Sequence, residues 1–260
     1  MLKRFTMLTT TLIWLLGVVG VHSLCAQEAP PQPVGPPPGG APAPAGGPPP
    51  PPPPPGLPGG INAPALQYVS PGVFEIGKCK IFKERGAVEL PASVNMKEGL
   101  LEYLLVGSSG KLHESLLRTD VEPYALQVAL LLSGLEGSLT HLNAQGENRL
   151  PEGDPIEITV SWSEDGKEKT ARIEEMVLQG KEKAGQIPWV FTGSVVNNGS
   201  FAAQVTKSII AVYHDPLAMI DHRLEDGASD EVWFANAQTT PPVGTPMTVT
   251  ITNKAQKPKK

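Results

Sequence analysis

Apolar and polar residues alternate in two long stretches of the chain. Every second residue is apolar over residues 156–162, and the same period returns over residues 247–251. A period of two is typical of a strand with one buried and one wet face. Residues 100–106 are instead apolar on both faces, which predicts a central strand covered from both sides. Glu102 lies in the middle of that stretch and therefore needs a partner or a watery pocket.

Two turn signals separate further strands. Asp165-Gly166 follows the first alternating stretch and predicts a hairpin, because both residue types accept a positive φ. Asn198-Gly199 predicts a type I′ turn that joins strands over residues 189–196 and 201–213. The chain is thus rich in strands from residue 156 to residue 251.

One helix is clearly indicated after residue 120. Pro123 suits the first helical turn. Apolar residues follow at helical spacing, namely Ala125, Val128, Ala129, Leu132 and Leu135. Leu130 and Leu131 widen the apolar face, so we expect this helix to be deeply buried against a sheet. These elements predict an α+β domain over residues 66–253, with a β-rich mixed or antiparallel sheet and one well-buried helix.

The first 26 residues differ from the rest of the chain. Lys3 and Arg4 form a short basic start, residues 12–21 are apolar or glycine, and small residues precede Gln27. This order is typical of a secretory signal, and the best cleavage position follows Ala26. We therefore expect an exported protein, in the periplasm, at the cell surface or outside the cell. An uncleaved membrane anchor is the main alternative.

Residues 27–65 form a spacer of mainly Pro, Gly and Ala, with an unbroken proline run over residues 48–55. Proline has no amide donor, so the accessible state is polyproline II. We expect a disordered, semi-rigid tether that would span roughly 100 Å if extended at about 3.1 Å per residue. A tether is most useful when one end is held, which favours the anchor. The alternative role is a docking ligand for an aromatic-lined groove.

Charge and cysteine content exclude several functions. Loss of Lys3 and Arg4 changes the balance from 21 basic and 26 acidic residues to 19 and 26, so the mature chain is acidic. We therefore expect no nucleic-acid partner, and membrane contact only through an uncleaved signal segment. Residues 254–260 form a basic tail that we expect to be disordered. Cys25 and Cys79 are the only cysteines, so cysteine-ligated zinc and iron–sulfur sites lack ligands.

Candidate site residues fall in two segments, with two additions from the central strand. They are Glu102, Tyr103, Lys111, His113, Glu114, Ser115, His214, Asp215 and Asp221. Their imidazole, carboxylate, hydroxyl and ammonium groups could serve acid–base chemistry or hold a divalent metal. His113 and Glu114 are adjacent, so on a strand they would point to opposite faces. No HExxH or GxSxG pattern is present.

Three runs of residues carry a family resemblance. They are residues 99–106 (GLLEYLLV), 111–117 (KLHESLL) and 124–131 (YALQVALL). The chain resembles the YdjY-domain family of exported bacterial proteins over about residues 71–251. The resemblance implies this domain and an exported context, and it implies no activity. Some relatives are described as ferredoxin-like, but the cysteines for iron–sulfur chemistry are missing here.

We expect a non-enzymatic exported module that binds an unknown ligand or protein at the cell envelope. The tether, the acidic β-rich domain and the missing catalytic motifs favour this function. The alternative is a metal-binding protein or metal-assisted hydrolase that uses the His113 and His214 segments. It predicts that the two imidazoles lie within a few ångströms of each other. No cofactor other than a divalent metal is indicated.

Overall fold

The computed structural model describes residues 64–256. The predicted export signal, nearly all of the spacer and the last four residues of the basic tail lie outside the described residues. Within the described part, no helix has the length and apolar character needed to cross a membrane.

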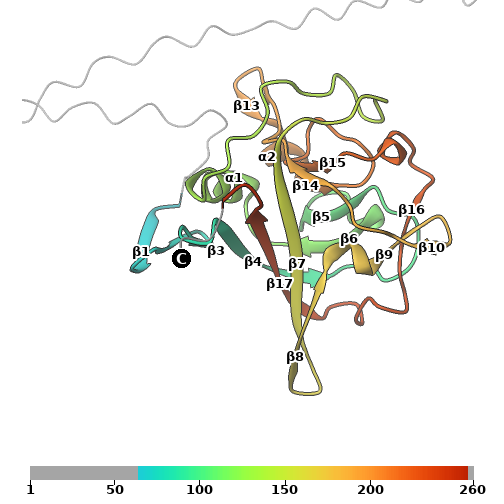
Figure 1. The fold of residues 1–260 in the computed structure, drawn as a ribbon, viewed down its shortest axis with the longest axis horizontal. Helices are drawn as coiled ribbons and strands as arrows, with labels where there is room; N and C mark the ends of the chain where they lie inside the picture. The colour runs from blue at the N-terminus through green and yellow to red at the C-terminus, as the bar shows by residue number, and fades with distance from the viewer. Residues whose placement is uncertain (1–63, 257–260) are drawn as a thin grey trace, which may run out of the picture. The chain divides into compact units, whose positions relative to one another are not determined.

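Strands make up most of the regular structure between residues 64 and 256 (Figure 1). They are β1 (Leu66–Ser70), β2 (Val73–Ile76), β3 (Cys79–Phe82), β4 (Ala87–Val94), β5 (Tyr103–Gly107), β6 (Ser115–Thr119), β7 (Asp154–Glu164), β8 (Lys167–Arg172), β9 (Val177–Gln179), β10 (Glu182–Lys183), β11 (Trp189–Phe191), β12 (Val196–Asn197), β13 (Ser200–Phe201), β14 (Ser208–Ala211), β15 (Ile220–His222), β16 (Trp233–Ala235) and β17 (Pro246–Asn253). The helices are α1 (Pro123–Leu132) and α2 (Ala202–Thr206), and 3₁₀ turns span Leu112–Glu114, Ile173–Met176 and Glu225–Ala228.

Eight of these strands close into a mixed barrel. The order is β4-β17-β7-β11-β15-β14-β5-β6, and β6 pairs back onto β4 through Val94 and Leu117. The pairs β14–β15 and β5–β6 are parallel, and the other barrel pairs are antiparallel. Strands β3, β2 and β1 extend outward from β4 in that order. Strand β8 pairs with β7 outside this circuit, and small sheets of β10-β9-β16 and β12-β13 complete the described strands.

The predicted α+β class is therefore wrong, because the fold is mostly β and its main sheet closes on itself. Alternation identifies a strand and its buried face, but it carries no information on which strands share hydrogen bonds. The strands over residues 156–162 and 247–251 are present as parts of β7 and β17, which pair along most of their length. The predicted strand over residues 100–106 is present only from Tyr103, as β5, which extends to Gly107 and has all five residues buried.

Helix α1 begins at Pro123 as the sequence predicts, but it ends at Leu132, so Leu135 lies beyond it. Pro123 occupies the first turn, and the chain turns out of the helix at Gly134, whose φ is +96°. Leu126 and Leu130 are fully buried, and the helix packs on β2, β3 and β4. Leu131 is 44% exposed, so the apolar face is narrower than its sequence suggests. The helix covers the sheet extension beside the barrel and lies outside the closed circuit of strands (Figure 1).

The two hairpin signals differ in outcome. Asp165 and Gly166 both have positive φ and join β7 to β8, as expected. Asn198 and Gly199 also adopt positive φ, but they join only the two-residue strands β12 and β13. The long hairpin predicted there is wrong, because β11 pairs with β7 and β15, whereas β14 pairs with β5 and β15.

Candidate functional site

Strand pairing brings two distant segments together at the start of β5. Tyr103 pairs with Ala211 at the end of β14, so the loop that follows β14 passes beside Tyr103. Tyr103 also pairs with Ser115 at the start of β6, which places the 3₁₀ turn before β6 beside Glu102. The backbone N–H of Glu102 donates to the carbonyl of Glu114 at 3.0 Å. The barrel thus fixes residues 102–115 and 211–217 around one point.

A buried hydrogen bond links the two segments. The Tyr103 hydroxyl donates to Oδ2 of Asp215 at 2.8 Å. The other carboxylate oxygen, Oδ1, accepts the backbone N–H of Leu217 at 2.9 Å. This second bond closes an Asx turn around Pro216, an arrangement that Asp favours because its short side chain reaches the backbone two residues on. Both oxygens of Asp215 are therefore held in place.

Lys111 lies between two carboxylates beside Tyr103. Its Nζ is 2.8 Å from Oε2 of Glu102 and 3.0 Å from Oε1 of Glu114. The same ammonium lies 5.2 Å from the centre of the Tyr103 ring, within cation–π range. Glu102, which needs a partner in its apolar strand, thus has one in Lys111.

Gln145 supplies a further polar contact that the sequence did not suggest. Its Nε2 donates to Oε2 of Glu102 at 3.0 Å and to the hydroxyl of Tyr103 at 3.3 Å. Gln145 belongs to a long loop without regular structure, and no motif surrounds it. Loop residues of this kind are recognised only once the fold has placed them.

Tyr103, Lys111, Gln145 and Asp215 border a cavity of about 250 Å³. The residues that line it are Tyr103, Lys111, Asn143, Ala144, Gln145, Thr206, Ser208, Asp215, Pro216 and Leu217. Lys111 and Asp215 are the charged residues among them, and Glu102 and Glu114, which do not line the cavity, both pair with Lys111. Because Lys111 already has two carboxylate partners, Asp215 is the charged lining group that favours a ligand with a cation and donor groups.

Burial and neighbouring charges shift several pKa values here. Burial raises the pKa of Asp215, and burial with the nearby Asp215 carboxylate raises that of Tyr103. Burial alone would raise the pKa of Glu102, but its bonds to Lys111 outweigh that effect and hold it below its usual value. Partial burial and the Glu102 carboxylate raise the pKa of Glu114. Perturbed groups around a cavity are typical of functional sites.

Neither His113 nor Ser115 lines the cavity. The side chain of His113 is 80% exposed, and its Nε2 is 3.5 Å from Oε2 of Glu114. Ser115 is buried and donates its hydroxyl to the carbonyl of Lys111 at 2.6 Å, which holds the 3₁₀ turn. On a strand, the side chains of His113 and Glu114 would point to opposite faces. The 3₁₀ turn lets them approach each other instead.

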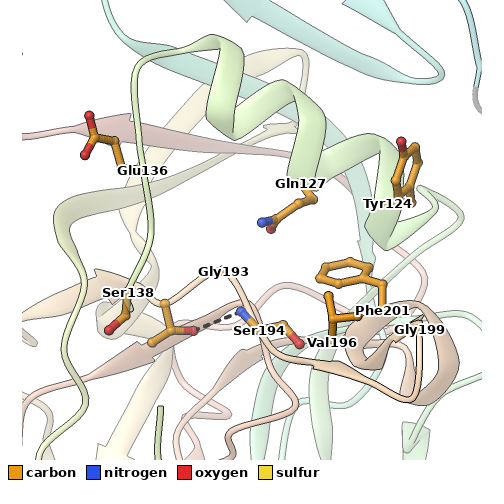
Figure 2. A pocket seen from close by; sticks show the side chains of 10 residues that line it. Tyr124, Gln127, Glu136, Ser138, Gly193, Ser194, Val196, Gly199 and Phe201 are labelled. Atoms are coloured by element: carbon orange, nitrogen blue, oxygen red, sulfur yellow. Dashed lines mark hydrogen bonds between the residues drawn. The ribbon is translucent and has the colours of Figure 1, made fainter. Parts of the chain in front are cut away.

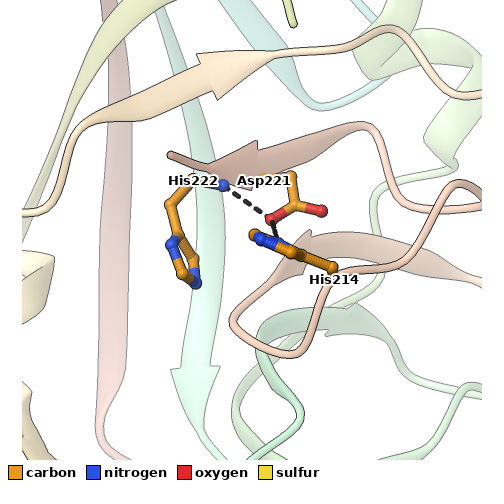
Figure 3. Close-up of side chains that lie close together, drawn as sticks. All are labelled: His214, Asp221 and His222. Carbon is orange, nitrogen blue, oxygen red and sulfur yellow. Dashed lines mark hydrogen bonds and ion pairs between the residues drawn. The ribbon is translucent and has the colours of Figure 1, made fainter. Parts of the chain in front are cut away.

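His214 and Asp221 belong to a second, fully buried cluster with His222 (Figure 3). Nδ1 of His214 lies 2.8 Å from Oδ1 of Asp221, and the same oxygen accepts the backbone N–H of His222 at 2.6 Å. The His222 ring lies edge-on to Trp189 and Trp233, with centroids 5.7 and 5.3 Å away. His214 and His113 therefore do not meet, since one ring is buried and the other exposed.

The His214–Asp221–His222 cluster has three potential metal ligands within 4.8 Å of one another. Its ring nitrogens are largely occupied, however. Nε2 of His222 bonds to the Val212 carbonyl at 2.9 Å, and its Nδ1 accepts the N–H of Leu224 at 3.2 Å. Among the described residues, Nε2 of His214 has no hydrogen-bond partner. A metal ion would have to replace several of these bonds, so the geometry is that of a hydrogen-bonded core network.

Fold and site together define a closed, mixed β-barrel domain with a small polar cavity at one point of its rim. The model of the YdjY domain matches residues 80–252. The chain therefore belongs to the YdjY domain family, and the resemblance seen in its sequence is confirmed. Searches of curated proteins and of solved structures gave no match.

Proposed function

We propose that this protein is an exported, non-enzymatic binding module that takes up a small ligand at the cavity beside Tyr103. One observation carries the proposal: Tyr103, Lys111, Gln145 and Asp215 reach a single cavity of about 250 Å³ from three separate segments of the chain. The export part rests on the basic and apolar leader and on the proline-rich segment that follows it.

The proposed ligand is a small polar molecule with an ammonium group and hydroxyl groups. Lys111 and Asp215 are the charged residues that line the cavity, and Lys111 is already paired with Glu102 and Glu114, so a cation would balance the charge of Asp215. The volume lies near the lower end for small-molecule sites, which favours a ligand the size of one amino sugar. Asp215 is the group proposed to receive the ammonium, because it is buried and its position is held by Tyr103 and Leu217.

Titration with glucosamine tests this proposal, with N-acetylglucosamine as the neutral counterpart. We expect glucosamine to shift the amide signals of Tyr103, Gln145 and Leu217 in a nitrogen–proton NMR spectrum, and the neutral sugar to shift them much less. Asp215→Asn should abolish the response, whereas Asp165→Asn, at an exposed hairpin tip where Asn accepts the same positive φ, should retain it.

Three results would count against the proposal. Equal shifts with both sugars would contradict the role of the ammonium. An unchanged response in Asp215→Asn would place the ligand elsewhere. Chemical conversion of either sugar by the wild-type protein during the titration would contradict the non-enzymatic part.

A further inference from the structure

A second, larger cavity lies between helix α1 and the β12–β13 hairpin (Figure 2). Its volume is about 380 Å³, and it is separate from the site beside Tyr103. The residues that line it are Tyr124, Gln127, Glu136, Ser138, Thr192, Gly193, Ser194, Val196, Gly199 and Phe201. We call this cavity the α1 groove.

The α1 groove has a firmly held wall. Ser194 adopts a φ of +60°, a conformation that costs energy in a residue with a Cβ. Its hydroxyl donates to the Leu217 carbonyl at 2.8 Å and accepts the N–H of Ala203 at 3.2 Å. These bonds fix the chain as it enters the hairpin, so Val196 and Phe201 face α1 in a set position (Figure 2).

The chemistry of the α1 groove suits a neutral, proline-rich chain. Two aromatic side chains, Tyr124 and Phe201, border it, and Glu136 is its sole charged lining residue. Val196 is 68% exposed although it is apolar. Oε1 of Gln127 is buried and has no hydrogen-bond partner in the described part of the chain. Aromatic grooves with a few polar groups bind polyproline II segments, whose rings pack on the aromatic faces.

The protein carries such a segment, and it joins the domain beside the α1 groove. Residues 30–63 contain no charged residue and include the proline run at 48–55. Pro64 and Ala125 lie on either side of Gly77: a Cβ built at Gly77 would be 3.5 Å from a side-chain atom of each. The described chain therefore begins next to the first turn of α1. Ala125 directly follows Tyr124 of the groove. The nine residue steps from Pro55 to Pro64 would span about 28 Å in polyproline II, more than the roughly 15 Å length of α1.

We propose that the proline run at residues 48–55 docks intramolecularly in the α1 groove. The glycines after the run supply backbone N–H groups, one of which reaches Oε1 of Gln127. Docking shortens the tether and holds the domain close to whatever retains its N-terminal end. The ligand cavity beside Tyr103 stays open, because the two cavities share no lining residue.

Paramagnetic relaxation in the chain from Gln27 to Lys260 tests the docking. A nitroxide is attached to Gly47→Cys, directly before the proline run. Cys79 does not compete for the label, because it is buried and burial raises the pKa of its thiol to about 12. We expect the amide signals of Gly193 and Gly199 to lose most of their intensity, and that of Gly166 at the β7–β8 turn to keep it. Reduction of the nitroxide gives the reference intensities.

Variants of the groove make the result specific. Phe201→Ala and, independently, Tyr124→Ala should restore the Gly193 and Gly199 signals, and the unfolding temperature of each shows whether it is folded. Tyr68→Ala removes an aromatic side chain that is 67% exposed outside the groove, so it should leave the broadening intact.

Two outcomes would overturn the proposal. Intact Gly193 and Gly199 signals in the labelled wild-type chain would show that the run does not dock. In a second sample, a nitrogen-15 chain without a nitroxide is mixed with an equal amount of chain that carries one. Broadening of the Gly193 and Gly199 signals in that sample would show docking between copies instead.

Discussion

The Tyr103 hydroxyl donates a 2.8 Å hydrogen bond to the carboxylate of Asp215, 112 positions further along the chain. The bond ties the start of β5 to the loop after β14, and both groups are buried. It exists because β14 and β5 are neighbours in the closed barrel, with Ala211 opposite Tyr103. The ligand cavity depends on this contact, since both residues line it.

Removal of this bond should destabilise the domain. In Tyr103→Phe, the Asp215 carboxylate loses its buried donor, so we expect the free energy of unfolding to fall by about 1–3 kcal/mol. Urea unfolding measures the change. Tyr68→Phe, at a tyrosine that is 67% exposed, should change stability by less than about 0.5 kcal/mol. Equal stability of the two variants would contradict the importance of the bond.

The stability of the domain should depend on the ionisation of Asp215. Burial raises the pKa of this carboxyl above its ordinary value of 3.8, so the folded state holds the proton more tightly than the unfolded chain does. Its contribution to stability is therefore present below pH 3.8 and is lost as pH rises through the folded-state pKa. We expect the unfolding free energy of Asp215→Asn to rise relative to wild type across that window, as measured by urea unfolding at a series of pH values. Asp165→Asn should follow the wild-type profile.

His222 should give a pH dependence of the opposite sign. Burial lowers its pKa below 6.5, so the unfolded chain takes up a proton that the folded state resists. The unfolding free energy should fall as pH drops from 6.5 toward the folded-state pKa. His222→Gln, whose amide can still donate to the Val212 carbonyl, should lack this part of the decline. His113→Gln, at an 80% exposed side chain, is the matched control and should keep the wild-type slope.

Lys111 should control the ionisation of Glu102. In Lys111→Met, burial still raises the pKa of Glu102 while the ammonium that lowers it is lost, so this pKa should rise from its lowered value. Carbon-13 NMR titration of the carboxyl group measures this. Lys169→Met, which removes an exposed pair with Glu164, is the control. An unshifted Glu102 would contradict the proposed charge arrangement.

Gly227 should tolerate no side chain. A Cβ there would overlap the ring of His214, which is fully buried and held by Asp221. We expect Gly227→Ala to lower the unfolding free energy by about 1–3 kcal/mol, the usual cost of overpacking a core. Gly185→Ala is the matched control, because a Cβ at that position has no neighbour within 4 Å. Thermal or urea unfolding of the pair distinguishes the two.

Local pattern determined much of the secondary structure. The alternation over residues 156–162 and 247–251 identified β7 and β17, and Pro123 with its following apolar residues identified α1. Asp165-Gly166 identified a tight turn. Each of these signals depends on neighbours in sequence, whose spacing alone sets which face is buried. The family was also recognisable from sequence, and its domain model covers residues 80–252.

The candidate site could be predicted only in part. Four residues were named correctly from sequence: Tyr103, Lys111 and Asp215 line one cavity, and Glu102 pairs with Lys111 beside it. His113 was named with them but faces outward, and His214 joins a separate core cluster. Gln145 was missed, since a loop residue without a motif has no signal until the chain is folded.

The sequence by itself determined the composition of each part: an apolar leader, a proline-rich segment that cannot form sheet or helix, and a strand-rich domain with one amphipathic helix. Only the tertiary structure decided that the sheet closes through β4 and β6 and that Tyr103 meets Asp215. The physical reason is that strand pairing joins backbone groups, which are the same in nearly every residue. The choice of partner strand depends on the packing of the whole core, and that choice places the site.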